Sequence, residues 1–424
     1  MHLQKHLAIV TLLLVVVRST FADTPASTIT LDEAVNAALA ENRDIAAARF
    51  VIREAEGRLK QAGLWPNPEL ELSRTTDVPF HDEGEYTESA AFKQRFPFSG
   101  RIAEAKSVAR LDVALAEAEV RDRERLLIGE VVGHYRGLLV ISEKLRTNEE
   151  LEHIVQQLVD VTQRRLKVAE VSPADLNLEK LELQKLLVNR SELAIERDTA
   201  RIALNELLGR EPQTALEPAE AIEIKLDKLI LHDSLDQAVM RRPDRAEAAL
   251  QIDRAVSEIG LAEAESWEDW TIGVGYDHNY SVFDSSVIGT QTDDFLGLSL
   301  SVPLPLWNRN EGQISAANAS KGKARAQLAA LDLKIMAESQ DAENQVRRFY
   351  AILEQYRHES IKLAEDNVHL LQKSYAEGIV GITSLIQAQQ QLRELRQSYA
   401  EAVGSYLRAL TEFETVTASS PYLK

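Results

Sequence analysis

The stretches Ile272-Gly-Val-Gly-Tyr276 and Leu296-Gly-Leu-Ser-Leu300 alternate large apolar residues with small ones. A period of two is that of a β-strand, in which successive side chains point to opposite faces. We therefore predict strands over about 269–280 and 293–303, each with one apolar face and one small or polar face. About ten residues is also the length that a tilted membrane strand requires.

A second pair of strands is predicted nearer the N-terminus, over about 68–76 and 89–97. Leu70 and Leu72 alternate with glutamates, and Phe92 alternates with Lys93 and Arg95. Tryptophan favours the boundary between membrane and water, and all four tryptophans of the chain stand beside these strands: Trp65, Trp267, Trp270 and Trp307. We expect them to form a membrane-interface belt; the alternative is that they fill ordinary junctions between helices and the sheet.

Long stretches without proline predict long helices over about 100–168, 173–208, 313–376 and 383–416. At 1.5 Å per residue the third would be about 95 Å long. Its apolar positions step by four and three residues, as in a coiled-coil seam. The seam residues are Phe349, Leu353, Tyr356, Leu363 and Leu370.

The chain contains an internal duplication. The segment from Leu166 to Leu176 aligns with that from Tyr375 to Leu385, and the step Asn42-Arg-Asp44 aligns with Arg242-Pro-Asp244. We predict a first repeat over 23–210, a linker over 211–228, a second repeat over 229–418 and a C-terminal tail over 419–424. Each repeat has a helix, two strands, a long helix, a tight turn and a second long helix, so the fold class is mainly α with a small β part.

The composition excludes several classes of protein. The chain has 424 residues, 48 Lys and Arg against 67 Asp and Glu, a formal charge of -19 and no cysteine. Without cysteine there is no disulfide, thiolate metal site or lipidated cysteine. An acidic chain repels nucleic acid, whose binding depends on basic side chains.

Residues 1–22 have the pattern of a secretory signal peptide. Lys5 supplies the basic region, Leu7 to Val17 the apolar run, and Thr20-Phe21-Ala22 a cleavage site between small residues. That run is too short to span a bilayer. A retained anchor is the alternative.

Four strands cannot close a barrel, and open sheet edges are not tolerated in lipid. Several copies must therefore combine. Two copies would give eight strands and a filled interior, whereas three give twelve strands and room for an aqueous lumen. We therefore predict a homotrimer with a twelve-stranded β-barrel above a long α-helical barrel.

The two tight turns are the predicted docking tips. Ser172, Pro173 and Asp175 form a helix start with a capping box, while Gly378 suits a left-handed helix end and Gly381 permits close approach. Val171, Ile379, Val380 and Ile382 are expected to be exposed apolar residues that a partner covers. The full predicted tips are Val171, Ser172, Pro173, Ala174, Gly378, Ile379, Val380, Gly381, Ile382 and Thr383.

Nothing in the chain indicates catalysis, a cofactor or a metal site. Gly273-x-Gly275 lies within a strand and lacks the rest of a dinucleotide loop, and the histidines are scattered. We expect no enzyme activity and no dedicated metal ligands.

The duplicated plan, both turns and the step Arg242-Pro-Asp244 resemble the TolC family of outer-membrane efflux channels over nearly the whole mature chain. Phe96-Pro-Phe-Ser-Gly-Arg101 and the segment from Val302 to Gly312 resemble its heavy-metal branch, of the cobalt-zinc-cadmium type. The resemblance implies a trimer in the outer membrane with a long periplasmic helical extension. It also implies a periplasmic adaptor (membrane fusion) protein and a proton-driven inner-membrane pump of the resistance-nodulation-division class as partners.

The resemblance also implies a pore gate, with departures. Asp175 matches the acidic residue of the first turn, but Ser384 and Gln387 stand where the family has two acids, and Val380 stands at the basic partner's position. We expect a weaker gate, in which three copies of Asp175 form a ring of carboxylates.

The predicted function is a passive exit duct for heavy-metal cations such as cobalt, zinc, cadmium or copper. Two alternatives stay open at this point. One is a duct for organic compounds or drugs, and the other is a soluble periplasmic coiled-coil structural or adaptor protein.

Overall fold

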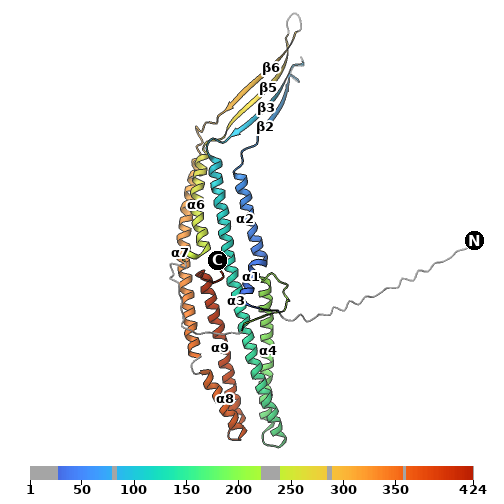
Figure 1. The fold of residues 1–424 in the computed structure, drawn as a ribbon, viewed down its shortest axis with the longest axis vertical. Helices are drawn as coiled ribbons and strands as arrows, with labels where there is room; N and C mark the ends of the chain where they lie inside the picture. Colours follow the sequence, from blue (N-terminus) through green and yellow to red (C-terminus); the bar gives the residue numbers. More distant parts are fainter. Residues whose placement is uncertain (1–26, 79–83, 221–238, 284–288, 357–359, 424) are drawn as a thin grey trace, which may run out of the picture.

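The computed structural model describes residues 27–78, 84–220, 239–283, 289–356 and 360–423. The molecule is a long rod, with a small sheet at one end and two helical hairpins reaching the other (Figure 1). The predicted signal peptide, residues 1–22, lies outside the described residues. No described helix is both long enough and apolar enough to cross a membrane.

The sheet has four antiparallel strands in the order β2-β3-β5-β6. They are β2 (Glu69–Thr76), β3 (Tyr86–Phe96), β5 (Trp270–Phe283) and β6 (Gly289–Ser301). The ladders continue into the expected loops, so β3 begins earlier, β5 ends later and β6 begins earlier than the alternation indicated. The central pair, β3 and β5, joins the two halves of the chain.

The strand register confirms the predicted alternation. Leu72, Ala90, Tyr276 and Leu296 stand in one row across the sheet. The next row on the same face is Leu70, Phe92, Val274 and Leu298. The opposite face carries Gly273 and Gly275 of β5 opposite Ser299 and Gly297 of β6.

The first half contributes α1 (Leu31–Glu41), α2 (Arg43–Ala62), α3 (Arg101–Lys167) and α4 (Pro173–Leu207). The second half contributes α6 (Pro243–Ala264), α7 (Glu311–Gln355), α8 (Ile361–Ala376) and α9 (Ile382–Val416). α3 with α4 forms the first hairpin and α8 with α9 the second, and both turns lie at the end of the rod away from the sheet (Figure 1).

The helix predicted over 313–376 is divided between α7 and α8. The predicted seam of buried apolar residues is wrong beyond Tyr356. Tyr356 and Ser360 have π-helical geometry, and residues 357–359 lie outside the described residues. From Leu353 to Val368 the buried positions are spaced one residue further apart than two heptads, and one extra residue rotates the seam that follows. The buried positions therefore pass from Leu353 to Val368 and Tyr375, while Leu363 and Leu370 are exposed.

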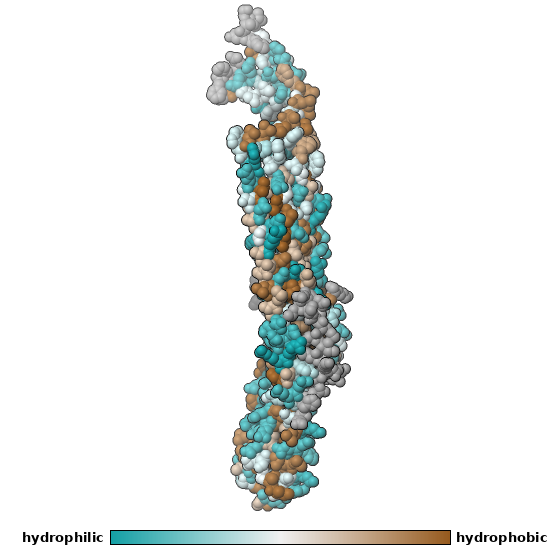
Figure 2. All heavy atoms as spheres, turned by 90° about the vertical axis from the view of Figure 1, so that its left-hand side faces the viewer, coloured by the Kyte–Doolittle hydropathy of each residue, from teal (hydrophilic) through white to brown (hydrophobic). Residues whose placement is uncertain are grey.

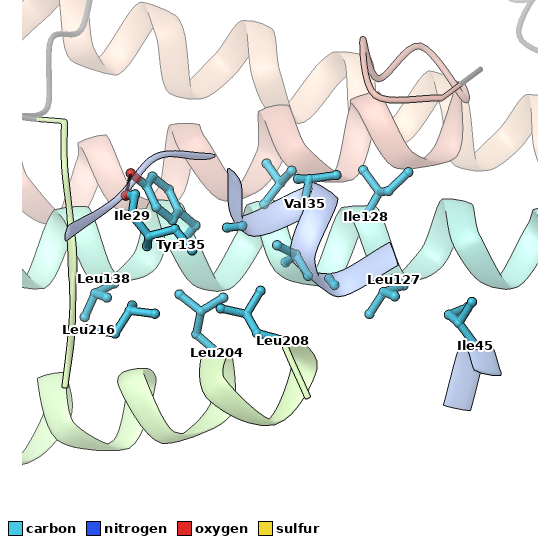
Figure 3. Packing of buried hydrophobic residues seen from close by; sticks show 14 residues of the cluster. Ile29, Val35, Ile45, Leu127, Ile128, Tyr135, Leu138, Leu204, Leu208 and Leu216 are labelled. Atoms are coloured by element: carbon cyan, nitrogen blue, oxygen red, sulfur yellow. Dashed lines mark hydrogen bonds between the residues drawn. The ribbon is translucent and has the colours of Figure 1, made fainter. Parts of the chain in front are cut away.

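A small core at the middle of the rod holds the first half together. β1 (Ser27–Ile29) pairs in parallel with β4 (Leu216–Pro218), which lies in the predicted linker; residues 221–228 of that linker lie outside the described residues. Figure 3 shows the apolar side chains that gather there from β1, α1, α3, α4 and β4. The buried Tyr135 donates its hydroxyl hydrogen to the Ile29 carbonyl, at 2.9 Å.

Candidate functional site

The first hairpin tip contains the predicted capping box. Ser172 Oγ accepts a hydrogen bond from the Asp175 amide at 3.2 Å, and Asp175 Oδ2 accepts one from the Ser172 amide at 3.0 Å. Pro173 is the first residue of α4. This helix start is confirmed, because its two orphan amides are satisfied as the sequence indicated.

Both tips end their first helix in the same way. The amides of Glu170 and Ile379 donate to the carbonyls five residues earlier, Arg165 and Ser374, at 3.0 and 2.9 Å. The left-handed residue of this Schellman motif is Gly378 in the second tip, as predicted, with φ of 74°. In the first tip it is Ala169, with φ of 62°, a position that the sequence did not reveal because alanine rarely adopts this conformation.

The close approach predicted at Gly381 does not occur within the described part of this chain. The Gly381 backbone is extended, the residue precedes α9 without a side-chain cap, and a β-carbon there would meet no atom within 4 Å. Close approach by another part of this chain therefore does not require glycine at this position.

The apolar tip residues differ in exposure. Ile379 is 71% exposed and Val168, which the sequence analysis missed, is 65% exposed. Val171 and Val380 are half-buried. The predicted exposure of Ile382 is wrong: it is only 4% exposed and belongs to a core cluster with Val368, Tyr375 and Leu385, because α9 turns its first apolar residue toward α8.

The predicted gate residues lie just above the tips. Asp175 is half-buried and uses Oδ2 in the cap, while Ser384 and Gln387 are exposed on the first turns of α9.

Polar side chains join the two hairpins above the tips. Thr162 Oγ1 of α3 donates to Glu179 Oε1 of α4 at 2.8 Å, and it lies 3.3 Å from the hydroxyl of Tyr375 in α8. Arg165 Nη1 donates to the Tyr375 carbonyl at 3.1 Å. Sequence reasoning missed this layer, although Glu179 stands at a seam position, four residues before Leu183.

A second connection lies about one turn higher. Glu182 of α4 is buried and accepts hydrogen bonds from Arg393 and Gln390 of α9. Farther along α9, Arg396 pairs with Glu365 of α8 at 2.6 Å and with Glu150 of α3 at 3.7 Å. The hairpins are therefore tied by charges as well as by apolar packing.

The apolar face of the sheet is exposed and bounded at both ends. Trp307 is 94% exposed, Trp65 and Trp267 are also exposed, and Trp270 packs edge-on against Phe98 with ring centroids 5.1 Å apart. At the other end a row of polar side chains crosses the strands: Arg74, Glu88, His278 and Asp294. The nine residues from Trp270 to His278 span about 26 Å along the strand, which suits the apolar part of a bilayer crossed at a tilt.

Metal ligands do not cluster in the part of the chain that the structure describes, since no group of three or more His, Asp or Glu residues there is placed to hold an ion.

A sheet with an exposed apolar face above paired helical hairpins defines the class as an outer-membrane channel protein. The chain belongs to the outer membrane efflux protein family, whose model matches residues 34–210 and 234–419. Family membership places the protein in the outer membrane, with its long helices extending into the periplasm.

Individual relatives are distant in sequence but similar along their whole length. The chain is 21% identical over 394 residues to the cobalt-zinc-cadmium resistance protein CzcC of Cupriavidus metallidurans, covering 92% of this chain and 90% of that protein. Its fold is similar to that of CusC, with a TM-score of 0.75, 18% identity and 92% of each chain covered. The CmeC outer membrane channel of Campylobacter jejuni has a TM-score of 0.72 at 13% identity, covering 91% of this chain and 85% of that one.

Proposed function

We propose that three copies of this chain form the exit duct of a tripartite, proton-driven efflux system for heavy-metal cations such as cobalt, zinc, cadmium or copper. The main observation in support of the trimer is that the sheet is open at both edges. Within the described residues β2 and β6 each have one unpaired edge. β6 runs opposite to β2, so β6 of one copy can pair antiparallel with β2 of the next, and twelve strands close without an edge.

The helices support a head-to-tail ring of copies. α4 carries an exposed apolar stripe with a strict seven-residue spacing: Leu181, Val188, Ile195 and Ile202. On the opposite edge of the protomer, α8 exposes Leu363 and Leu370 with the same spacing. Figure 2, which faces α7 and α8, shows hydrophobic side chains along this edge and again at the tip end. Seams with matching periods pack as coiled coils, so α4 of one copy would cover α8 of its neighbour.

In this arrangement each level of the rod meets a different environment. Outer-membrane lipid would cover the apolar sheet face, with Trp65, Trp267, Trp270 and Trp307 at its boundary. The periplasmic adaptor would cover the tips, where Val168 and Ile379 are exposed, and would connect them to the inner-membrane pump. The predicted docking residues Val171, Ser172, Pro173, Ala174, Val380 and Thr383 lie around these two.

The proposed cargo rests on the relation to CzcC, whose name assigns it to cobalt, zinc and cadmium resistance. The sheet face opposite the lipid carries small residues, the carboxylates of Asp277 and Asp293, and the ion pairs of Lys93 with Glu71 and of Arg95 with Glu69. This polar surface suits the passage of hydrated ions. We propose a passive path, since the pump supplies the energy and the family consists of channels.

Two experiments test the proposal separately. Outer-membrane fractionation followed by native mass analysis of the detergent-extracted chain should give a trimer of the processed chain; a monomer or dimer would overturn the assembly. A strain lacking the gene should lose tolerance to cobalt, zinc, cadmium or copper and regain it on complementation. Unchanged metal tolerance together with increased sensitivity to organic compounds would replace the metal cargo with drugs.

A further inference from the structure

Glu179 is a buried carboxyl group in the seam between α3 and α4, one turn beyond Asp175. Glu179 is only 2% exposed. Oε1 accepts the hydrogen bond from Thr162, but Oε2 has no hydrogen-bond partner among the described residues. An unpaired buried carboxylate oxygen is costly when the group is charged.

The same layer reaches the second hairpin. Thr162 contacts the Tyr375 hydroxyl, and the Arg165 guanidinium lies 4.9 Å from the centre of the Tyr375 ring. Three helices, α3, α4 and α8, therefore meet around Glu179. A change in this layer alters the packing of one hairpin on the other, not merely the packing within one hairpin.

The charged groups around Glu179 do not neutralise it. Arg165 of α3 binds the Tyr375 carbonyl and lies 3.8 Å from Glu170, while Arg393 of α9 binds Glu182. On its own helix Glu179 meets another acid, Asp175. Burial raises the pKa of Glu179 to about 6; the hydrogen bond from Thr162 opposes this rise, and the charge of Asp175 adds to it.

Glu182 provides the contrast, because it is equally buried but well paired. Arg393, Gln390 and Lys185 all bind its carboxylate, the last two at 3.1 and 3.4 Å. Two cations, Arg393 and Lys185, therefore pair with this carboxylate. Of the two buried acids on this part of α4, Glu182 therefore has cationic partners, whereas Oε2 of Glu179 has no hydrogen-bond partner among the described residues.

We propose that Glu179 makes the joint between the two hairpins sensitive to protons. When its carboxyl group is neutral, the layer of Thr162, Glu179 and Tyr375 stays packed and the tips stay together. When the carboxyl group is charged, burial away from water is unfavourable. The layer then opens to solvent and the tips separate. This proposal rests on the geometry of the tips and not on the cargo or partners proposed above.

The absence of cysteine makes a distance measurement straightforward. Glu170→Cys and Glu377→Cys place one spin label on each exposed tip of the full chain. The labelled chain is diluted with unlabelled chain in detergent, so that each assembly holds one labelled copy. Electron–electron double resonance should show one short distance at pH 5 and a second, longer distance at pH 7.5. We expect the ratio of the two populations to change roughly tenfold between these pH values, as proton linkage to a pKa raised from 4.5 to about 6 implies.

Glu179→Gln keeps the shape and the bond to Thr162 but carries no charge, so it should show the short distance at both pH values. If that variant does not give the native helical circular dichroism spectrum, Glu179→Met, which fills the seam with an apolar side chain, takes its place with the same expectation. Glu182→Gln is the matched control and should retain the pH response. A parent chain whose distances do not change with pH, or a response that persists without the Glu179 carboxyl group, would overturn the proposal.

Discussion

A β-carbon on Gly129 of α3 would lie 2.3 Å from Oγ1 of Thr415 in α9. Thr415 cannot turn away freely, because Oγ1 donates to the Thr411 carbonyl at 2.8 Å and the threonine side chain is short and branched. Glycine at this position therefore lets the last helix of the second half pack directly on the first long helix.

Gly129→Ala should accordingly destabilise the protein by about 1–3 kcal/mol, the usual cost of overpacking a close contact. The matched control is Gly137→Ala, on the same helix, where a β-carbon meets nothing within 4 Å; it should leave stability unchanged or raise it by up to about 1 kcal/mol. Thermal unfolding of both variants checks this. Equal shifts in the two would show that Thr415 moves aside.

Asp175→Asn should weaken the cation preference of the channel, since it removes one carboxylate per copy from the entrance. Asp175 also completes a capping box, so Ser172→Ala is the control: it disrupts the cap but keeps the charge. Single-channel recordings in planar bilayers measure the preference. If both variants, or neither, change it, the carboxylate ring is not the gate.

Arg393→Met should loosen the joint between the hairpins. It removes a cation from the buried Glu182 carboxylate, leaving Gln390 and Lys185 as partners, and we expect a loss of about 1–3 kcal/mol. Arg190→Met breaks a more exposed pair, with Glu152 at 3.2 Å, and should cost at most about 1 kcal/mol. Amide hydrogen exchange of residues 173–185 and 382–393 compares them; similar exchange in the two variants would contradict the expectation.

Val188→Glu should prevent assembly, because it places a charge in the apolar stripe that we assign to the neighbouring copy. Lys180→Glu introduces a glutamate at an exposed position of α4 that lies about 100° around the helix from Leu181, and it should leave the assembly intact. Native mass analysis of the detergent-extracted chains distinguishes them. A Val188→Glu chain with the parent's mass distribution would remove α4 from the interface.

Stability should fall as the pH rises through the range in which Glu179 loses its proton. The native pKa of about 6 exceeds the ordinary value of 4.5, so the folded chain holds this proton more tightly than the unfolded chain. The stabilisation is fully present below pH 4.5 and is lost by about pH 6.5. The rise of the pKa corresponds to at most about 2 kcal/mol, measured as the difference between parent and Glu179→Gln unfolding at pH 4.5 and 7.

Much of the fold could be predicted because its signals act over one or two turns. Alternation along Ile272 to Tyr276 identified the strands and their apolar face, and the register bears this out. The capping box at Ser172 and the left-handed end at Gly378 follow from residue types within four positions of each other. The internal duplication then allowed the strands and turns predicted in one half of the chain to be predicted in the other half as well.

The burial of some side chains and the conformation of one turn depended on tertiary contacts, which could not be predicted from the sequence. The seam is displaced by one residue between Leu353 and Val368, so Leu363 and Leu370, expected to be buried, form an exposed edge. Ile382, expected to be exposed, is covered by α8. The left-handed Ala169 adopts a conformation that its residue type disfavours, and only the surrounding hairpin stabilises it.

By itself, then, the sequence determined the elements, their amphipathic faces and the turns, because these arise from backbone geometry and from side chains a few residues apart. The tertiary structure alone decided that β3 and β5 join the halves, that Gly129 meets Thr415, and that Glu179 lies beside Thr162 and Tyr375. The burial and pKa of a side chain depend on groups brought to it from distant parts of the chain, and periodicity along one helix does not specify those groups.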